Sequence, residues 1–281
     1  MSDIQHIRNQ TNLFLIALAF FTRIPVGDKI NFSQFNLNHA SRYFSLVGWI
    51  VGGVSALVFI LTLYLLPINI AVVLTMLFGI LLTGSFHEDG LADTCDGFGG
   101  GWTKKQKLEI MKDSRLGTFG AVAIWFALAL KLISLLSLAA LGAEFVIIGT
   151  LVAHPLSRSV STSVIFFLPY VNDEMNSKVK PLAEKQHLFD FGLSLIIGLF
   201  AMCLVLDIAI LLTVSLIFTY CSLIWLFKKQ IGGFTGDTLG ATQQISELII
   251  YLVLVGRASV INGSPIISST GKGLSLLGVD L

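Results

Sequence analysis

Four carboxylates fall within nine residues at the end of a hydrophobic segment, in the stretch HEDGLADTCDGFGGG that begins at His87. Only 12% of the chain is charged, so this stretch concentrates charge. Asp89, Asp93 and Asp96 have the spacing i, i+4 and i+7, which places them on one helix face, where like charges repel. A divalent cation would remove that repulsion. Oxygen ligands without a matching set of Cys and His favour Mg²⁺, or Mn²⁺, over zinc, so we predict such a metal here.

The residues on either side of the three aspartates fit phosphate chemistry. Glu88 is the fourth carboxylate, although it lies off the aspartate face in a regular helix. His87 has three open interpretations: a general base, a donor to a phosphate, or a structural histidine. Gly99, Gly100 and Gly101 follow, and glycines let backbone N–H groups approach a phosphate closely. The stretch therefore predicts metal-dependent phosphate chemistry at a membrane surface.

The loop that follows contains a second candidate for phosphate binding. Arg115 is suited to hold a phosphate with two hydrogen bonds, or alternatively to act as a positive anchor beside the membrane. Asp113 is either a further ligand or an ion-pair partner of Lys112 or Arg115. The sequence leaves both pairs of alternatives open.

A glycine-rich segment, GGFTGDTLG, begins at Gly232 and leads into a predicted helix. Its glycines, Gly236 among them, can form a turn that holds a phosphate at the helix N-terminus. Asp237 is a candidate catalytic residue, with the helix N-cap as the alternative. We expect this segment to meet residues 97–101 over one site. Further on, Gln243 and Glu247 are four residues apart and share a face that should look into the bundle.

Lys131 and Arg158 lie near the middle of predicted membrane spans. Charges at that depth are costly and face a partner or a cavity. Either they counter the charge of a substrate, with Arg158 the stronger candidate for substrate binding, or they neutralise a buried carboxylate such as Glu247. The sequence does not choose between these roles.

The composition predicts an all-α polytopic membrane protein. The 281 residues are 54% hydrophobic, with a mean hydropathy of +0.83. A formal charge of +1 gives no general attraction for nucleic acid, and three scattered cysteines form neither a metal motif nor a disulfide framework. Segments of about 20 apolar residues predict six to seven spans, with residues 12–25 undecided between spanning and lying at the interface. These spans are residues 44–66, 68–86, 119–141, 145–168, 191–206, 208–227 and, with a polar first half, 238–256.

Basic residues favour one side of this arrangement. Fourteen of the 18 Lys and Arg residues precede the first long span or follow the second, fourth and sixth. The opposite connections, at residues 67, 142–144 and 207, contain none. This asymmetry predicts that residues 87–118, 169–190 and 228–237 are cytoplasmic. We predict one membrane-embedded catalytic domain, residues 1–256, followed by an extension, residues 257–281, to which we assign no function.

Taken together, the motifs resemble the cobalamin synthase family of adenosylcobinamide-GDP ribazoletransferases. The resemblance rests on residues 87–97, 109–118 and 235–241, with the early stretch FTRIPV at residues 21–26, and runs from about residue 10 to residue 255. It implies an integral membrane, Mg²⁺-dependent enzyme that joins adenosylcobinamide-GDP to α-ribazole, or to its 5′-phosphate, and releases GMP. Other cobalamin-assembly enzymes are implied as partners.

The resemblance also implies site residues. Its acidic motif matches Glu88, Asp89, Asp93 and Asp96 as metal ligands, although the family often has an apolar residue at the position of Glu88. Asp237 matches the acidic residue of the family's later loop. Family members usually end near residue 255, so the last residues of this chain are additional.

Two other functions compete with this one. A CDP-alcohol phosphotransferase also places aspartates at the end of a membrane helix, but its motif Asp-Gly-x-x-Ala-Arg has no match, because Leu91-Ala92-Asp93-Thr94 follows Gly90. An ion-coupled transporter would use the charges within the spans. The acidic cluster lies at a span end rather than in mid-membrane, which weighs against transport.

Overall fold

A computed structural model describes residues 3–27, 30–171 and 183–261 of the chain. Regular structure in these residues is helical, and the β pairing among them is one isolated bridge between Tyr170 and Phe234. The predicted all-α fold is confirmed. The helices are α1 (Asp3–Phe21), α2 (Gln34–Ala40), α3 (Phe44–Leu63), α4 (Ile68–Thr83), α5 (Phe86–Gly100), α6 (Lys104–Lys112), α7 (Thr118–Leu141), α8 (Ala143–Phe167), α9 (Leu188–Leu199), α10 (Ala209–Gln230) and α11 (Gly236–Ile261).

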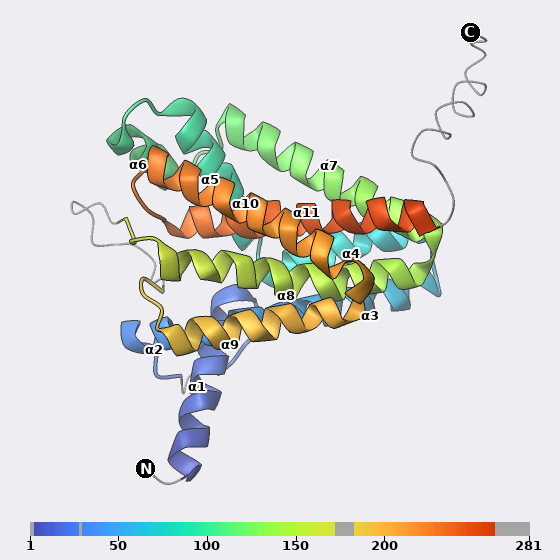
Figure 1. Cartoon of the computed structure of the whole chain (residues 1–281), viewed down its shortest axis with the longest axis horizontal. Coiled ribbons are helices and arrows are strands. Elements are labelled where there is room, and N and C mark those ends of the chain that lie inside the picture. Colours follow the sequence, from blue (N-terminus) through green and yellow to red (C-terminus); the bar gives the residue numbers. More distant parts are fainter. Residues whose placement is uncertain (1–2, 28–29, 172–182, 262–281) are drawn as a thin grey trace.

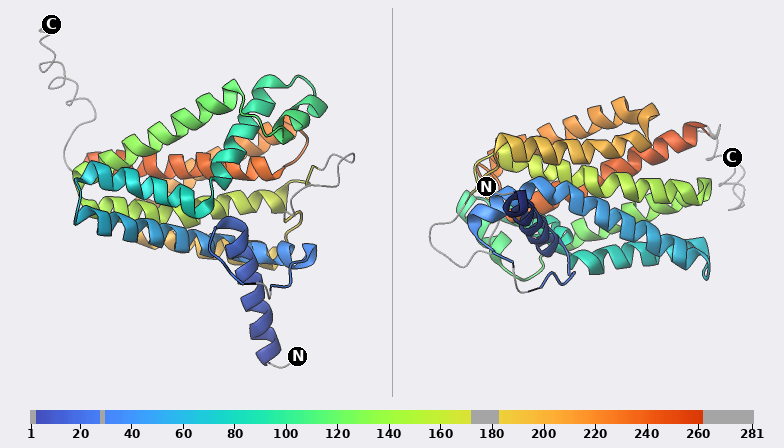
Figure 2. Two further views of the ribbon diagram at one scale, coloured as in Figure 1. Left: turned by 180° about the vertical axis from the view of Figure 1, so that it is seen from behind. Right: turned by 90° about the horizontal axis from the view of Figure 1, so that it is seen from below.

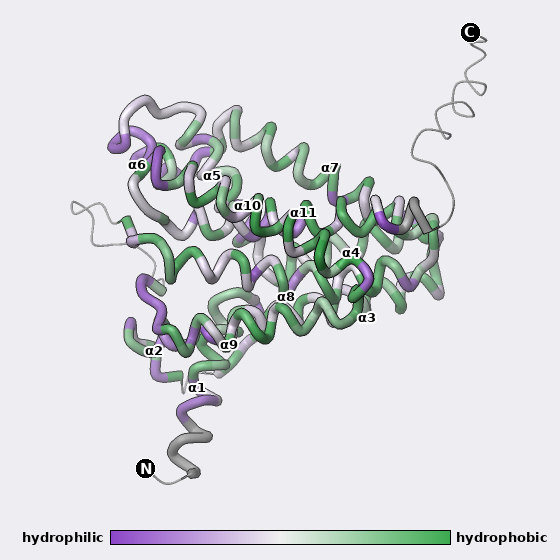
Figure 3. Tube along the Cα trace, viewed as in Figure 1, coloured by the Kyte–Doolittle hydropathy of each residue, from purple (hydrophilic) through white to green (hydrophobic). Residues whose placement is uncertain are grey.

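The long helices run side by side, while α1 projects from the bundle at an angle (Figures 1 and 2). Helix α8 is enclosed by its neighbours, and every residue from Val152 to Ser159 is buried. Helices α7 and α10 instead expose large apolar side chains, including Trp125, Phe126 and Phe218. Apolar residues cover the length of the bundle and polar ones gather near α2 and α6 (Figure 3). Such a surface suits a hydrocarbon environment.

Fewer helices meet the length and apolarity of a membrane span than the six to seven predicted. In the described part of the chain, four do: Gln34–Leu63, Thr118–Leu141, Leu206–Gln230 and Gly236–Arg257. A fifth is obtained if α4 and α5, bent by 84° at their junction, count as one broken span. Helix α8 has 25 residues, but Ser157, Arg158 and Ser159 make it polar, and the segment predicted at residues 191–206 forms only the short α9 and 3₁₀ turns.

The predicted second span ends early, at Thr83. Gly84 and Ser85 both adopt left-handed backbone conformations, with φ of 65° and 59°. Two such residues in succession cannot continue a right-handed helix, and a left-handed conformation is uncommon for serine. The chain turns there and begins α5, which carries the acidic stretch.

The connections that were predicted to share one side meet at one end of the bundle. His39 Nδ1 lies 2.8 Å from Asp190 Oδ2, and Phe234 N–H donates to the carbonyl oxygen of Pro169 at 3.0 Å. At the other end Arg257 pairs with Asp207 at 2.5 Å, Nε to Oδ2. Helix α11 itself continues to Ile261. Lys178, Lys180 and residues 262–281 lie outside the described residues.

Candidate active site

The three aspartates share a face of α5, as their spacing predicts, but they differ in environment. Asp89 is exposed, Asp93 is half-buried and Asp96 is only 6% exposed. No group of three or more His, Cys, Asp or Glu side chains close enough to hold a metal occurs among the residues the structure describes. Each predicted ligand therefore has to be assessed by its own contacts.

Asp96 is bound to the beginning of α7. Its two carboxylate oxygens accept hydrogen bonds from the backbone N–H groups of Gly117 and Gly120, each at 2.8 Å. A Cβ atom at Gly117 or Gly120 would lie 2.3–2.4 Å from the carboxylate, so only glycine permits this approach. A carboxylate at a helix N-terminus satisfies free N–H groups and complements the helix dipole. Asp96 thus joins α5 to α7, a role that the acidic spacing did not reveal.

His87 and Glu88 point into the bundle from the first turn of α5. His87 is 3% exposed and stacks on Phe21, with ring centroids 5.3 Å apart. Glu88 accepts a hydrogen bond from Gln244 Nε2 at 3.2 Å through Oε1, while its buried Oε2 has no hydrogen-bond partner in the structure. The expectation that Glu88 lies off the aspartate face is confirmed by this inward contact.

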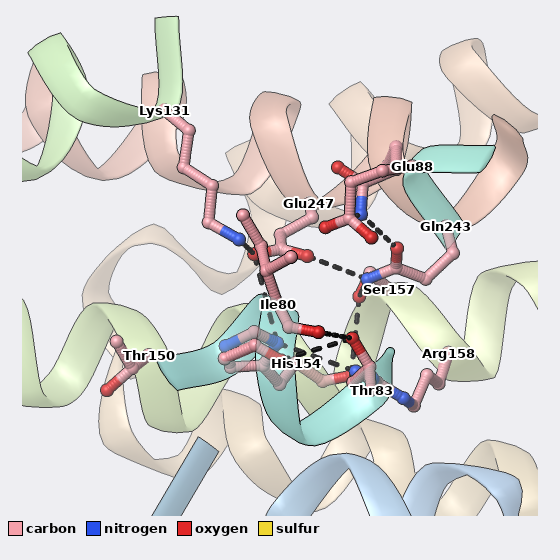
Figure 4. A network of polar contacts seen from close by, with 12 residues as sticks. Ile80, Thr83, Glu88, Lys131, Thr150, His154, Ser157, Arg158, Gln243 and Glu247 are labelled. Carbon is pink, nitrogen blue, oxygen red and sulfur yellow. Dashed lines mark hydrogen bonds and ion pairs between the residues drawn. The ribbon is translucent and has the colours of Figure 1, made fainter. Parts of the chain in front are cut away.

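A buried polar network resolves one of the alternatives for the charges within the spans (Figure 4). Lys131 Nζ lies 2.5 Å from Glu247 Oε1, and Gln243 Nε2 donates to Glu247 Oε2 at 2.7 Å. The predicted shared face of Gln243 and Glu247 is confirmed. Gln244 Nε2 also donates to Gln243 Oε1 at 2.9 Å, so the network reaches Glu88. Lys131 therefore neutralises a buried carboxylate.

Arg158 differs from Lys131. It is 2% exposed, and its Nη1 donates to the carbonyl oxygen of His154 at 3.0 Å. Its Nε has no hydrogen-bond partner, and no described carboxylate forms an ion pair with it. Glu247 and Glu88 lie within electrostatic range of Arg158, but neither pairs with it directly. A buried guanidinium without a direct anionic partner is costly, which leaves it able to bind a further anion.

Arg158 and His87 line a small internal cavity of about 10 Å³. Gly236 and Gly240, from the first turns of α11, complete its polar side, and phenylalanine rings form much of the rest. The structure therefore brings together three predicted site residues, His87, Arg158 and Gly236. The guanidinium of Arg158 and the N-terminus of α11 are the groups of this corner that can attract an anion, although Asp237 lies in the same first turn of α11.

The crossing of α5 and α11 depends on two glycines. A Cβ atom at Gly90 would lie 2.9 Å from the carbonyl oxygen of Asp237, and one at Gly240 would lie 3.1 Å from the Cα of Gly90. The backbones can approach this closely only without side chains. The backbone of Asp237 is thereby held against Gly90, next to Asp89 in the sequence.

Asp237 is not the N-cap of α11, contrary to the alternative considered from the sequence. Thr235 occupies that position: its Oγ1 accepts from Thr238 N–H at 3.3 Å, and Thr238 Oγ1 accepts from Thr235 N–H at 2.9 Å. Asp237 lies in the first turn, half-buried, and accepts a hydrogen bond from Thr235 Oγ1 at 3.4 Å. Its carboxylate is therefore not required as a cap.

The other predicted phosphate-binding residues lie at the far end of α5. Gly99 and Gly100 belong to its last turn, where Phe119 covers Gly99, and Gly101 is its C-cap. With a rise of 1.5 Å per residue, Gly100 is about 15 Å along the helix from Gly90. Residues 97–101 nevertheless approach the beginning of the glycine-rich segment, because Phe98 packs against the hydrophobic clusters that contain Ile231 and Phe234. The close backbone contact with residues 236–240 is made by Gly90, which lies against Asp237 and Gly240.

Arg115 also lies at this far end. Its guanidinium binds Asp113 through Nε at 3.0 Å and Nη2 at 2.5 Å, and its side chain is 87% exposed. These hydrogen bonds lower the pKa of Asp113 and raise that of Arg115. The ion-pair alternative for Asp113 is the one the structure shows.

Comparison with known proteins agrees with the motifs. The family model described as Cobalamin-5-phosphate synthase matches residues 13–255. The adenosylcobinamide-GDP ribazoletransferase of Shewanella pealeana is 51% identical over 249 residues, which cover 88% of this chain and 96% of the relative. Those of Shewanella woodyi and Shewanella piezotolerans are 46% and 48% identical, and the matches cover 89% of this chain and 98% and 97% of the relatives. No solved structure matches the chain.

Proposed function

The chain belongs to the cobalamin-5-phosphate synthase family, and we propose on this basis that it joins adenosylcobinamide-GDP to α-ribazole, or to α-ribazole 5′-phosphate, with release of GMP. The observation that carries the proposal is identity of 46–51% to ribazoletransferases over nearly their whole length. In this reaction a ribose hydroxyl oxygen of the acceptor forms a bond to the phosphorus attached to cobinamide. The bond from that phosphorus to the GMP oxygen breaks, and GMP leaves with the electron pair.

The chain's own residues supply the groups that this step needs. Arg158 and the N–H groups at the start of α11 are the donors that we assign to non-bridging phosphate oxygens beside His87. Their cavity of about 10 Å³ has room for about one water, so substrate binding has to widen it. We assign the proton of the attacking hydroxyl to Asp237, because Thr235 rather than Asp237 caps α11 and the backbone of Asp237 lies against Gly90 at the α5 crossing. His87, stacked on Phe21, positions this corner or donates to a phosphate.

Only some of the α5 carboxylates suit a bound Mg²⁺. Mg²⁺ is usually held by one or two carboxylates together with substrate phosphates and water. Asp89 and Asp93, one turn apart on the accessible part of the helix, suit that role, whereas the oxygens of Asp96 already bind α7. A bound Mg²⁺ would supply charge neutralisation for the diphosphate. If this assignment holds, a chelator should abolish GMP release and added Mg²⁺ should restore it.

We further propose that the enzyme lies in the bacterial inner membrane with the α5 and α6 end in the cytoplasm. The basic residues of the described connections gather at that end, and α7 and α10 expose large apolar side chains between the ends. A cysteine at Lys105, which is exposed on α6, tests the orientation. Labelling of that cysteine by an impermeant reagent in intact cells would contradict it.

The decisive test of the function is an assay of the purified protein with Mg²⁺, adenosylcobinamide-GDP and α-ribazole. We expect release of GMP together with formation of the joined corrinoid product. A headgroup transferase would instead release CMP from a CDP-lipid, and a transporter would do neither. The buried Lys131–Glu247 pair weighs against transport, because it accounts for two of the charges within the spans.

A further inference from the structure

A groove of about 420 Å³ lies at the bend between α4 and α5, outside the corner formed by His87 and Arg158. Its walls come from the end of α1, the segment after it, the α4–α5 junction and the first turn of α5. The lining residues are Ala19, Phe20, Thr22, Arg23, Phe32, Thr83, Gly84, Phe86 and Asp89. A volume of this size is in the range of small-molecule sites.

The groove carries one cation and one anion that do not pair with each other. Among the described residues, neither the guanidinium of Arg23 nor the carboxylate of Asp89 has an ion pair or side-chain hydrogen bond, and both are exposed. The backbone of Arg23 is fixed, because its N–H donates to the carbonyl oxygen of Leu82 at 2.8 Å. The guanidinium lies against Gly84, where a Cβ atom would be 2.2 Å from its Nε. Arg23 is thus positioned by its backbone and by Gly84, and both exposed charges are available to a ligand.

The remaining walls are aromatic. Phe20 and Phe86 are in contact, with centroids 5.2 Å apart in an edge-on arrangement, and Phe32 is 46% exposed although it is a large apolar side chain. Phe20 and Phe86 also line the internal cavity beside Arg158, so the groove and that cavity lie on either side of the same two rings. The groove therefore offers an aromatic surface, an arginine and a carboxylate next to the proposed reaction centre.

We propose that this groove binds the acceptor nucleoside, and that Arg23 binds its 5′-phosphate. The inference rests on the proposed function. An aromatic base can stack on phenylalanine rings. A guanidinium is suited to a terminal phosphate, and a ribose hydroxyl would then be directed towards Asp89. The corrinoid of the other substrate is too large for this volume. Arg23 is thus the residue that distinguishes α-ribazole 5′-phosphate from α-ribazole.

The test compares the two acceptors on Arg23→Gln, which keeps a polar side chain but removes the charge. For α-ribazole 5′-phosphate, kcat/KM should fall by about tenfold or more, chiefly through KM, the effect of losing a charge-assisted hydrogen bond. For α-ribazole, kcat/KM should stay within about twofold, since it has no phosphate to lose. Arg23→Lys should recover part of the loss. Lys105→Ala is the control, because it removes an exposed charge on α6. It should leave kcat/KM unchanged for both acceptors.

Phe32→Ala tests the aromatic wall independently. It should raise KM for both acceptors alike and leave KM for adenosylcobinamide-GDP unchanged. Two results for Arg23→Gln would overturn the assignment: an equal fall in kcat/KM for both acceptors, or no change in kcat/KM for either. A raised KM for adenosylcobinamide-GDP in Phe32→Ala would also overturn it. Failure of the proposed function is a separate result, because the wild-type enzyme would then release no GMP with either acceptor.

Discussion

The two ends of helix α5 carry similar residues in opposite structural situations. Near its beginning, Asp89 is exposed in a groove and Gly90 lets α11 cross closely. Near its end, Asp96 is buried with both oxygens bound to backbone N–H groups, and Gly99 packs against Phe119. One aspartate is available to a ligand and the other is committed to holding two helices together. The comparison shows that a shared helix face does not imply a shared role.

The largest effect should come from Asp89→Asn. Removing this accessible charge should lower kcat by about 10²-fold or more, the scale of a lost group that acts on the reacting atoms. Thermal unfolding in detergent should change little, because the Asp89 side chain has no hydrogen bond or ion pair within the described part of the chain. Glu109→Gln, which removes an exposed carboxylate on α6, is the matched control. Near-normal turnover of Asp89→Asn would contradict the assignment of Asp89 to substrate or metal binding.

Asp237→Asn should have the next largest effect. The expected fall in kcat is on the order of 10²-fold, because a proton acceptor is lost. Stability should be retained, since Thr235 rather than Asp237 caps α11. Thr235→Ala provides the converse variant: it should cost about 1 kcal/mol of stability. Its effect on kcat should be smaller than that of Asp237→Asn, because it removes only a hydrogen bond of 3.4 Å to the Asp237 carboxylate. An active Asp237→Asn enzyme would assign Asp237 to structure alone.

Asp96→Asn should behave differently from Asp89→Asn. Because an amide offers one acceptor oxygen in place of two charged ones, we expect a loss of about 1.5–3 kcal/mol in stability. Turnover by the folded fraction should fall by less than about tenfold. Denaturation in detergent, followed alongside GMP release, separates the two quantities. A stable but inactive Asp96→Asn protein would show that Asp96 acts on the substrate or metal after all.

Arg115→Ala should have the smallest effect. The side chain is 87% exposed and pairs with a neighbour two residues away, and exposed ion pairs contribute about 0–1 kcal/mol. We expect kcat/KM within about twofold of the wild type. A fall in kcat/KM of more than about tenfold would indicate that Arg115 binds phosphate and that the site extends to the far end of α5.

Much of the site could be predicted where it depends on neighbours along the chain. The common face of the three aspartates, the position of Glu88 off that face and the shared face of Gln243 and Glu247 follow from helical periodicity. The pairing of Lys131 with Glu247 was one of two open alternatives, because the sequence gives no distance between residues on different helices. The capping of α11 by Thr235 was missed, although a threonine three residues before another polar side chain is a known pattern for a helix start.

The sequence by itself determined an all-α membrane bundle with its basic connections at one end, because hydropathy and charge act residue by residue. It also determined the acidic face of α5, because helical spacing is local. Tertiary structure alone decided that Asp96 holds α7, that Gly90 meets Gly240, and that Arg23 shares a groove with Asp89. These contacts join segments from about 20 to 150 residues apart, and they depend on how closely backbones can pack, which no local pattern specifies.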